Sequence, residues 1–154
     1  MKKFIMNTQG NASLLSIFLV MILCVFSIVI YSVVMVYANY QTAYTELERA
    51  AIITVDENMF NPNVRDLEFD IPQTALTDVE ENLISCGLYK EPDGTWKRAN
   101  DRRLVYELKD LNVTLQEECL YLSVMFAMPL PWHITEQTEV TLPITVRSKV
   151  LYIN

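Results

Sequence analysis

Glycine, cysteine and histidine are scarce in this chain, which has three, three and one of them among 154 residues. A Gly-rich phosphate-binding loop is absent, and neither G-x-S-x-G nor H-E-x-x-H occurs. The single His133 and the lack of any C-x-x-C spacing argue against a zinc site. Neighbouring acids such as Glu80 and Glu81 are typical of a solvated surface. We therefore expect a protein that is not an enzyme and that uses no metal or cofactor.

Charge is missing from the segment between Ala12 and Ala38, which is 27 residues long. A helix of that length extends about 40 Å, more than the roughly 30 Å hydrocarbon core of a bilayer. A soluble helix this long would normally have a polar face, so the segment predicts a membrane span. Val36-Tyr37-Ala38 resembles a signal-peptidase site, but the apolar run before it exceeds the roughly 7 to 15 residues of a secretory signal. We expect the span to be retained.

Charge on the two sides of the span predicts its orientation. Lys2 and Lys3 lie on the short side, and positive residues beside a span stay cytoplasmic. The chain from Asn39 onward has 19 acidic and 10 basic residues, a formal charge of −9. Such a domain is expected to be soluble and to avoid nucleic acid. The predicted protein is a single-pass protein of the cell membrane, in contact with lipid, with a cytoplasmic N-terminus and an extracytoplasmic C-terminal domain.

The helical pattern continues beyond the apolar run. Tyr40, Tyr44, Leu47 and Ala51 recur at spacings of four, three and four, which describes one face of an amphipathic helix. No proline or glycine interrupts residues 11–61. The sequence predicts a cytoplasmic leader over 1–10, a continuous transmembrane and extended helix over 11–58 that stops before Asn61-Pro62-Asn63, and an extracytoplasmic domain over 59–154.

The rest of the chain predicts a short helix and several strands. Thr77-Asp78-Val79-Glu80 has the form of a capping box, and Gly87 is placed to end that helix. Pro92-Asp93-Gly94 predicts the turn of a hairpin. Further strands are expected over 104–108, 120–126 and 140–153, where Pro143 predicts either two strands or one interrupted edge strand. The expected fold class is α+β: a long N-terminal helix followed by a small antiparallel sheet domain with one short helix.

The cysteines leave two interpretations open. Cys24 lies inside the predicted span, so only Cys86 and Cys119 can pair with each other. A disulfide between them is chemically allowed in an extracytoplasmic domain, and we expect the two residues to lie near one another. The alternative is a pair of thiols that act as small hydrophobic residues.

A short basic leader ending in Gly10, an apolar helix and a small C-terminal sheet together resemble the plan of type IV pilin-like proteins. Within that group the chain is most similar to TadE-like pilus assembly proteins, also called pseudopilins. Gln9-Gly10-Asn11-Ala12-Ser13 resembles the start of that pattern, and Thr145-Val146-Arg147-Ser148-Lys149-Val150 resembles its end. The resemblance implies that a prepilin peptidase cuts between Gly10 and Asn11, and that the partners are other pilin-like or pilus assembly subunits.

The chain departs from that pattern at two positions. The family usually has a basic residue before the glycine and a glutamate five positions after it, where this chain has Gln9 and Leu15. In pilins the glutamate pairs with the new N-terminal amine of a neighbouring subunit. Here Ala12 and Ser16 offer instead a small-xxx-small face for helix packing in lipid. Outside lipid, we expect association through Tyr40, Tyr44 and Leu47.

Two classes of function follow. The first is a minor pilin-like structural or assembly subunit of a bacterial surface appendage or secretion system, associating through its N-terminal helix. The second is a signal-anchored accessory or partner-binding domain with no pilus role, in which Gly10 is only a junction before the anchor.

Overall fold

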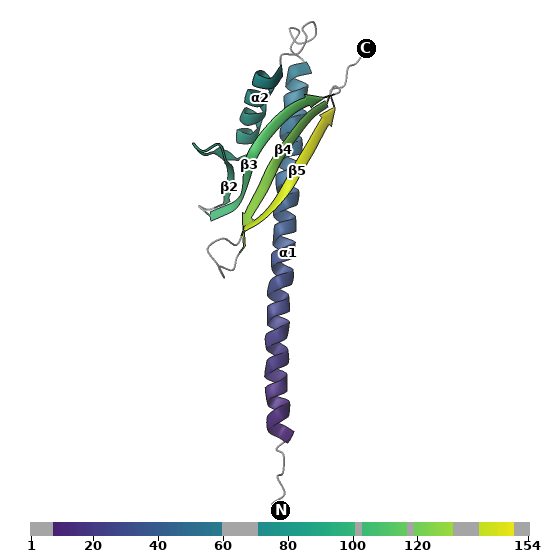
Figure 1. The fold of residues 1–154 in the computed structure, drawn as a ribbon, viewed down its shortest axis with the longest axis vertical. Coiled ribbons are helices and arrows are strands. Elements are labelled where there is room, and N and C mark those ends of the chain that lie inside the picture. Colours follow the sequence, from purple (N-terminus) through teal and green to yellow (C-terminus); the bar gives the residue numbers. More distant parts are fainter. Residues whose placement is uncertain (1–7, 60–70, 101–102, 117–118, 131–138, 150–154) are drawn as a thin grey trace, which may run out of the picture. The chain divides into compact units, whose positions relative to one another are not determined.

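A computed structural model describes residues 8–59, 71–100, 103–116, 119–130 and 139–149 (Figure 1). The chain forms two compact units, Met1–Met35 and Val36–Asn154. Within these ranges the order of elements is a long helix, a short helix and five strands. This arrangement confirms the predicted α+β class with a long N-terminal apolar helix and a small antiparallel sheet.

Helix α1 covers Thr8–Met59 and passes through both units. It ends one residue beyond the predicted end at residue 58, while Asn61-Pro62-Asn63 lie outside the described residues. It starts before the predicted position, because Gly10 is already helical. A helix tolerates one glycine at a cost of about 1 kcal/mol. The chain therefore has no break at the predicted junction between leader and helix.

Helix α2 covers Ile71–Ser85, six residues more at its start than the capping box predicted. Thr77 and Asp78 therefore lie inside the helix and do not cap it. Pro72 explains the earlier start, because the amides of a first helical turn have no intrahelical acceptor and proline fits there.

The C-terminus of α2 is a Schellman motif around Gly87, as the sequence predicted. The Gly87 amide donates to the Ile84 carbonyl at 2.9 Å, and the Leu88 amide donates to the Leu83 carbonyl at 3.2 Å. Gly87 has a φ of 89°, a conformation that favours glycine. Leu83 and Leu88 are both buried, which is the hydrophobic contact that usually accompanies this motif.

The predicted hairpin is present as β1 (Tyr89–Lys90) and β2 (Trp96–Asn100). The Gly94 amide donates to the Glu91 carbonyl at 3.0 Å, and the Asp93 carboxylate accepts from the Thr95 amide at 2.9 Å. The Thr95 hydroxyl donates to the same carboxylate at 2.6 Å, and these two donors lower the pKa of Asp93. Proline, aspartate and glycine each have the role in this turn that their backbone preferences predict.

Five antiparallel strands form one sheet in the order β1-β2-β3-β4-β5. The three long strands are β3 (Arg103–Gln116), β4 (Cys119–Pro129) and β5 (Glu139–Lys149). A bulge interrupts the pairing of β3 with β4 between Lys109 and Asn112, and Asp110 within it has a φ of 56°. Pro143 lies in an edge strand that continues past it to Lys149, so the described part of the predicted last segment is one strand and not two. Residues 150–153 of the prediction lie outside the described residues.

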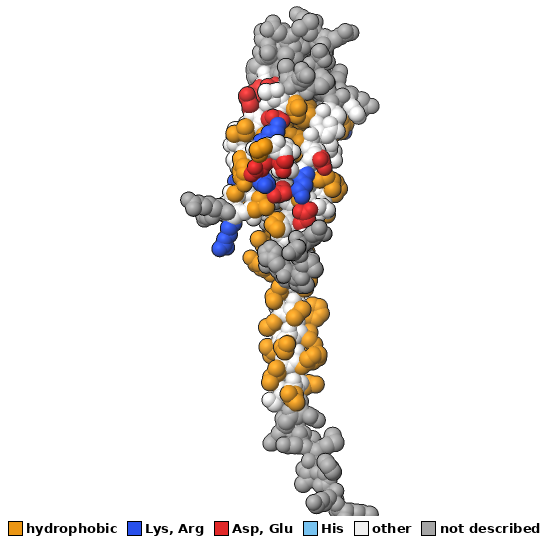
Figure 2. All heavy atoms as spheres, turned by 60° about the vertical axis from the view of Figure 1, so that its left-hand side comes forward, with side chains coloured by type: hydrophobic (Ala, Val, Ile, Leu, Met, Phe, Trp, Pro, Cys, Tyr) orange, Lys and Arg blue, Asp and Glu red, His pale blue; other side chains and the backbone are white. Residues whose placement is uncertain are grey.

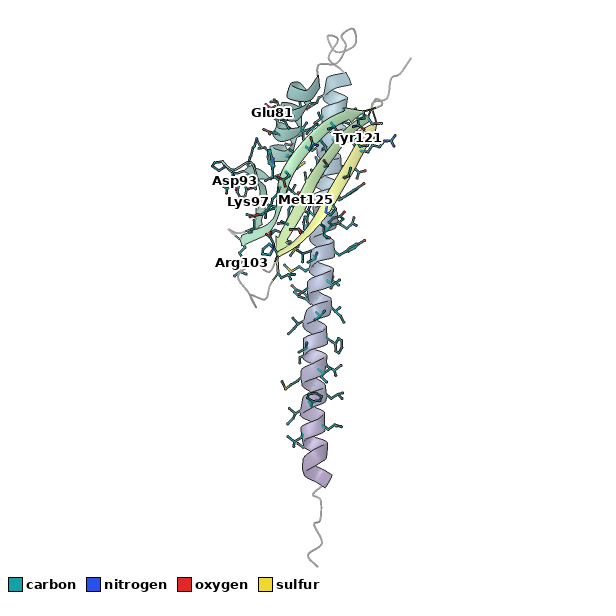
Figure 3. All side chains as sticks on the ribbon, in the orientation of Figure 1. Glu81, Asp93, Lys97, Arg103, Tyr121 and Met125 are labelled. Atoms are coloured by element: carbon teal, nitrogen blue, oxygen red, sulfur yellow. The ribbon has the colours of Figure 1, made fainter. Side chains whose placement is uncertain are left out.

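The core of the second unit lies between its helices and one face of the sheet. Alternate residues of β4 are buried toward α1, including Leu122, Val124 and Phe126. Leu47 of α1 is fully buried, and Tyr40 packs edge-on against Phe126 with ring centroids 5.7 Å apart. The opposite face of the sheet, on which Tyr121, Met125 and Lys97 are labelled in Figure 3, is not covered by either helix.

The two glycines with positive φ predict a difference in stability. Alanine at Gly94 meets no atom within 4 Å, whereas a Cβ at Gly87 lies 2.5 Å from the Arg98 guanidinium. We expect Gly94→Ala to lower the free energy of unfolding by about 1 to 2 kcal/mol through backbone strain alone. Gly87→Ala should lower the free energy of unfolding by about 1 to 2 kcal/mol more than Gly94→Ala does, because Arg98 must give up its hydrogen bond to the Cys86 carbonyl.

Urea unfolding of the full-length chain in detergent, followed by tryptophan fluorescence, measures both values. An equal decrease in the free energy of unfolding in the two variants would contradict the close contact between Gly87 and Arg98.

Candidate functional site

The first candidate surface is the part of α1 that precedes the second unit. Apart from the half-buried Ile22, its large hydrophobic side chains from Leu14 to Val34 are between 45% and 71% exposed and lie on all sides of the helix. Figure 2 shows hydrophobic side chains along this part of α1, and both signs of charge in the second unit. Exposed apolar surface on every side of a helix is unfavourable in water and suits a hydrocarbon environment. This helix is long and apolar enough for a single-pass membrane anchor.

The residues predicted for processing and packing in lipid all lie within α1. Gly10 and Asn11 are helical, and the side chains of Asn11 and Ala12 are not among those that the structure describes. Ser16 is exposed on the helix surface. The predicted association of Ala12 and Ser16 with another helix stays a prediction.

The residues predicted for association outside lipid fall into two groups. Leu47 belongs to the core of the second unit. Tyr40 is half-buried, and its hydroxyl donates to the Pro143 carbonyl at 3.3 Å. Tyr44 is half-buried on the same side of the helix. Tyr40 therefore packs on the sheet of its own chain, whereas the exposed part of Tyr44 is available to another molecule.

The two candidate disulfide residues are free thiols, Cys86 half-buried and Cys119 buried. The Cys86 carbonyl accepts from Arg98, which pairs with Tyr106, whereas Cys119 pairs with Gln116 at the other end of β3. Ten positions of β3 separate these two places, about 30 Å at roughly 3.3 Å per residue. The prediction that the two cysteines lie near one another is wrong, because a disulfide needs Cα atoms within about 7 Å.

A polar cluster that the sequence did not indicate joins α1 to the sheet. Glu46 accepts a hydrogen bond from the Tyr106 hydroxyl and lies 3.4 Å from the Arg98 guanidinium. Arg98 also donates to the Cys86 carbonyl at 2.5 Å, at the end of α2. Burial raises the pKa of Tyr106 well above its usual range, and the hydrogen bond to Glu46 raises it further. The cluster connects α1, α2, β2 and β3 through one carboxylate and one guanidinium.

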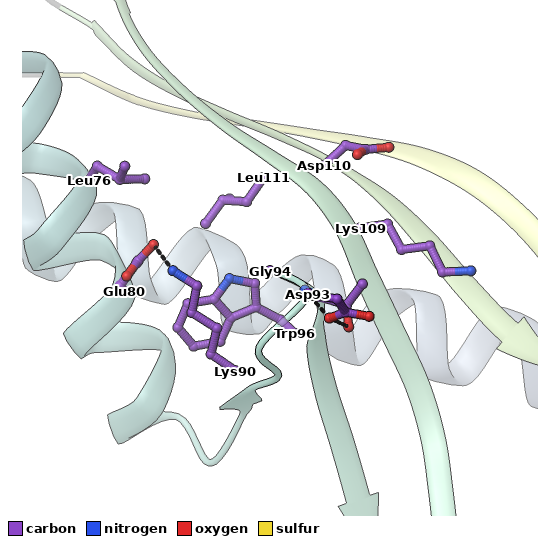
Figure 4. A pocket seen from close by; sticks show the side chains of 10 residues that line it. Leu76, Glu80, Lys90, Asp93, Gly94, Trp96, Lys109, Asp110 and Leu111 are labelled. Atoms are coloured by element: carbon purple, nitrogen blue, oxygen red, sulfur yellow. Dashed lines mark hydrogen bonds and ion pairs between the residues drawn. The ribbon is translucent and has the colours of Figure 1, made fainter.

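A shallow hollow of about 420 Å³ lies between α2, the hairpin and the bulge of β3 (Figure 4). Its apolar walls are Leu76, Trp96 and Leu111. Lys90 at its rim forms an ion pair with Glu80 at 2.6 Å and lies 5.7 Å from the centre of the Trp96 ring. This ion pair lies at the rim of the hollow. The residues that line the hollow include no nucleophile next to a general base.

Charged side chains of alternating sign cross the open face of the sheet. Lys97 lies 3.5 Å from Glu107, and Lys109 lies 3.6 Å from Glu107 and 3.3 Å from Glu139. Loss of solvation opposes the charge on Lys97, but Glu107 and Glu91 together raise its pKa. Within the described ranges no three His, Cys, Asp or Glu side chains gather as metal ligands. The open face is a solvated surface with short-range pairing of charge.

The Tyr106 hydrogen bond predicts a loss of stability at alkaline pH. The folded state holds the phenol proton that the unfolded chain releases near pH 10, so this contribution is complete below about pH 10 and is lost as the pH rises further. Tyr106→Phe should remove that dependence and lower the free energy of unfolding at pH 7 by about 1 to 3 kcal/mol, because Glu46 loses a donor.

Urea unfolding from pH 7 to 11 checks this, with Tyr89→Phe as the control because Tyr89 is exposed on β1. If the two variants showed the same alkaline slope, the assignment to Tyr106 would be wrong.

Comparison with protein-family models, curated proteins and solved structures finds no match to this chain.

Proposed function

We propose that this protein is a minor pilin-like, TadE-like subunit of a bacterial surface appendage or secretion system, anchored by α1 and associating with other subunits through that helix. One observation carries the proposal: a single helix is apolar on all sides over Leu14–Val34 and also forms the core of a sheet domain. A membrane anchor needs only the apolar surface. A helix that also forms part of a domain core can link contacts with other helices in lipid to the folded domain.

Several features of the chain support the proposal. The helix followed by a small antiparallel sheet agrees with the plan of the family that the sequence resembles. Ser16 is exposed where a small residue permits close approach of another helix. Tyr44 is half-buried on the flank of α1, and tyrosine is a residue type enriched in protein interfaces.

A signal-anchored accessory domain without a pilus role is the second candidate. The unbroken helical backbone from Thr8 through Gly10 favours it, since Gly10 then marks no structural junction. Leu15, in the place of the glutamate that the family usually has, also favours it.

Topology is the first test of the proposal. Lys2 and Lys3 before the span, and the acidic excess after it, predict that a reporter fused after Asn154 is extracytoplasmic. Alkaline phosphatase should be active and a cytoplasm-dependent fluorescent reporter inactive at that position. The opposite pattern would contradict both candidate functions.

Processing and association separate the two candidates. In cells with an active prepilin peptidase, N-terminal sequencing of the purified protein should begin at Asn11, and in a peptidase deletion it should begin at Met1. Ser16→Leu should reduce co-purification with other appendage subunits about tenfold, because a large side chain separates the helices.

Ile17→Leu is the matched control for Ser16→Leu, because it keeps the volume of an exposed side chain on another face of the helix. Full assembly of the Ser16→Leu variant, or an unchanged appendage after deletion of the gene, would contradict the pilin-like function. The accessory-domain function would then be the remaining candidate.

A further inference from the structure

The tripeptide Asn-x-Ser/Thr occurs at two places in the chain, Asn11-Ala12-Ser13 and Asn112-Val113-Thr114. With any residue except proline in the middle, this tripeptide is the acceptor for N-linked glycosylation. A pattern this short also arises by chance, so its structural setting decides whether it is suited to be an acceptor. The two copies have opposite settings.

The first copy, Asn11-Ala12-Ser13, belongs to helix α1 at the start of the apolar run. Residues two positions apart on a helix do not face each other. An enzyme that recognises the asparagine and the hydroxyl residue together therefore finds them on different sides of the helix. The predicted orientation also places this copy on the cytoplasmic side of the span.

The second copy, Asn112-Val113-Thr114, belongs to strand β3, where the geometry is the reverse. Val113 pairs with the buried Leu122 of β4 and therefore points toward the core. Asn112 and Thr114 point to the open face of the sheet, and both are exposed. They lie on the same side of an extended chain, about 7 Å apart at roughly 3.3 Å per residue.

The surroundings of Asn112 leave room for an oligosaccharide. Its neighbour across the sheet is Ser123 of β4, and the next residue in the same row is Thr145 of β5. These side chains are short, and neither helix covers this face of the sheet (Figure 3). Their hydroxyl groups donate and accept hydrogen bonds, as sugar hydroxyls do. A glycan on Asn112 therefore extends over a polar row without displacing a core side chain.

The backbone near Asn112 is open on one side of β3. Within the described residues, β2 pairs with β3 only as far as Leu108, so β4 is the one strand beside Asn112. The bulge between Lys109 and Asn112 interrupts the pairing with β4, and Asp110 is exposed within it. An enzyme that binds a diphosphate donor needs positive charge in its site. A carboxylate two positions before the acceptor therefore favours binding to such an enzyme.

We propose that Asn112 is an N-glycosylation site, modified outside the membrane by a transferase that uses an oligosaccharide linked to a lipid diphosphate. The Asn112 amide nitrogen forms a bond to the anomeric carbon of the first sugar. The bond from that carbon to the diphosphate breaks, the amide nitrogen loses one proton to a base of the enzyme, and the lipid diphosphate leaves. The inference depends on the predicted orientation of the span, which both candidate functions share, and not on a pilus role.

Mass spectrometry of the full-length protein, purified from membranes of the cells that produce it naturally, tests the site. We expect peptides containing Asn112 to have the added mass of an oligosaccharide, and peptides containing Asn11 to lack it. Thr114→Val should lower the glycosylated fraction at least about tenfold, because valine has the shape of threonine without its hydroxyl. Thr114→Ser is the matched control, because it keeps the hydroxyl and therefore the glycan.

Asp110→Asn tests the contribution of the carboxylate. Asparagine tolerates the φ of 56° at this position, so the variant changes the charge and keeps the backbone of the bulge. We expect the glycosylated fraction to fall about three- to tenfold.

Three results would overturn the proposal: no oligosaccharide on Asn112, an oligosaccharide on Asn11, or equal glycosylation of the Thr114→Val and Thr114→Ser variants. The reporter fused after Asn154 separates the site from the orientation. An extracytoplasmic reporter together with unmodified Asn112 contradicts the glycosylation site alone. None of these results decides whether the gene is needed for an appendage.

Discussion

Close packing of the sheet on α1 is the constraint on which the second unit depends. The inner face of the helix has small residues, Ala43, Ala50 and Ala51, around the larger Leu47, and all four are fully buried. Phe126 contacts Tyr40 of α1, Tyr106 donates to Glu46 of α1, and the two aromatic rings lie 5.5 Å apart. Residues with larger side chains would push the sheet away from the helix and leave the aromatic rings without close contacts.

The Glu46 cluster completes this packing at the border of the core. Its carboxylate is bound from two strands, by Tyr106 of β3 and Arg98 of β2. Asn82 of α2 makes a comparable connection to α1, because its amide donates to Thr54 at 3.1 Å and to Glu57 at 3.2 Å. Both connections give polar side chains at the border of the core hydrogen-bond partners from another element.

Local patterns predicted the elements whose causes are local. The length of α1, the hairpin turn and the glycine that ends α2 follow from hydrophobic runs and from backbone preferences at Pro92, Gly94 and Gly87. The edge position of Pro143 follows from its missing amide hydrogen.

Other features depend on contacts between distant parts of the chain and had no local signal. Strand β3 appeared to end at Leu108, because the bulge at Asp110 shifts the alternation: Tyr106 and Leu108 share a face with Val113. The capping-box motif indicated a start of α2 at Thr77, whereas the helix begins at Ile71. The contacts of Glu46 had no signal in the sequence, since neither Tyr106 nor Arg98 is near it along the chain.

The hydrogen bond from Tyr40 to the Pro143 carbonyl also has a consequence for the order of folding. During synthesis α1 is made before β5. The Tyr40 hydroxyl therefore has no Pro143 carbonyl to bind until β5 has been made. Until β5 docks, its carbonyl is open to any other unpaired strand, including one from a neighbouring nascent chain. Docking of β5 therefore occupies this one acceptor of the edge in the same step that completes the sheet.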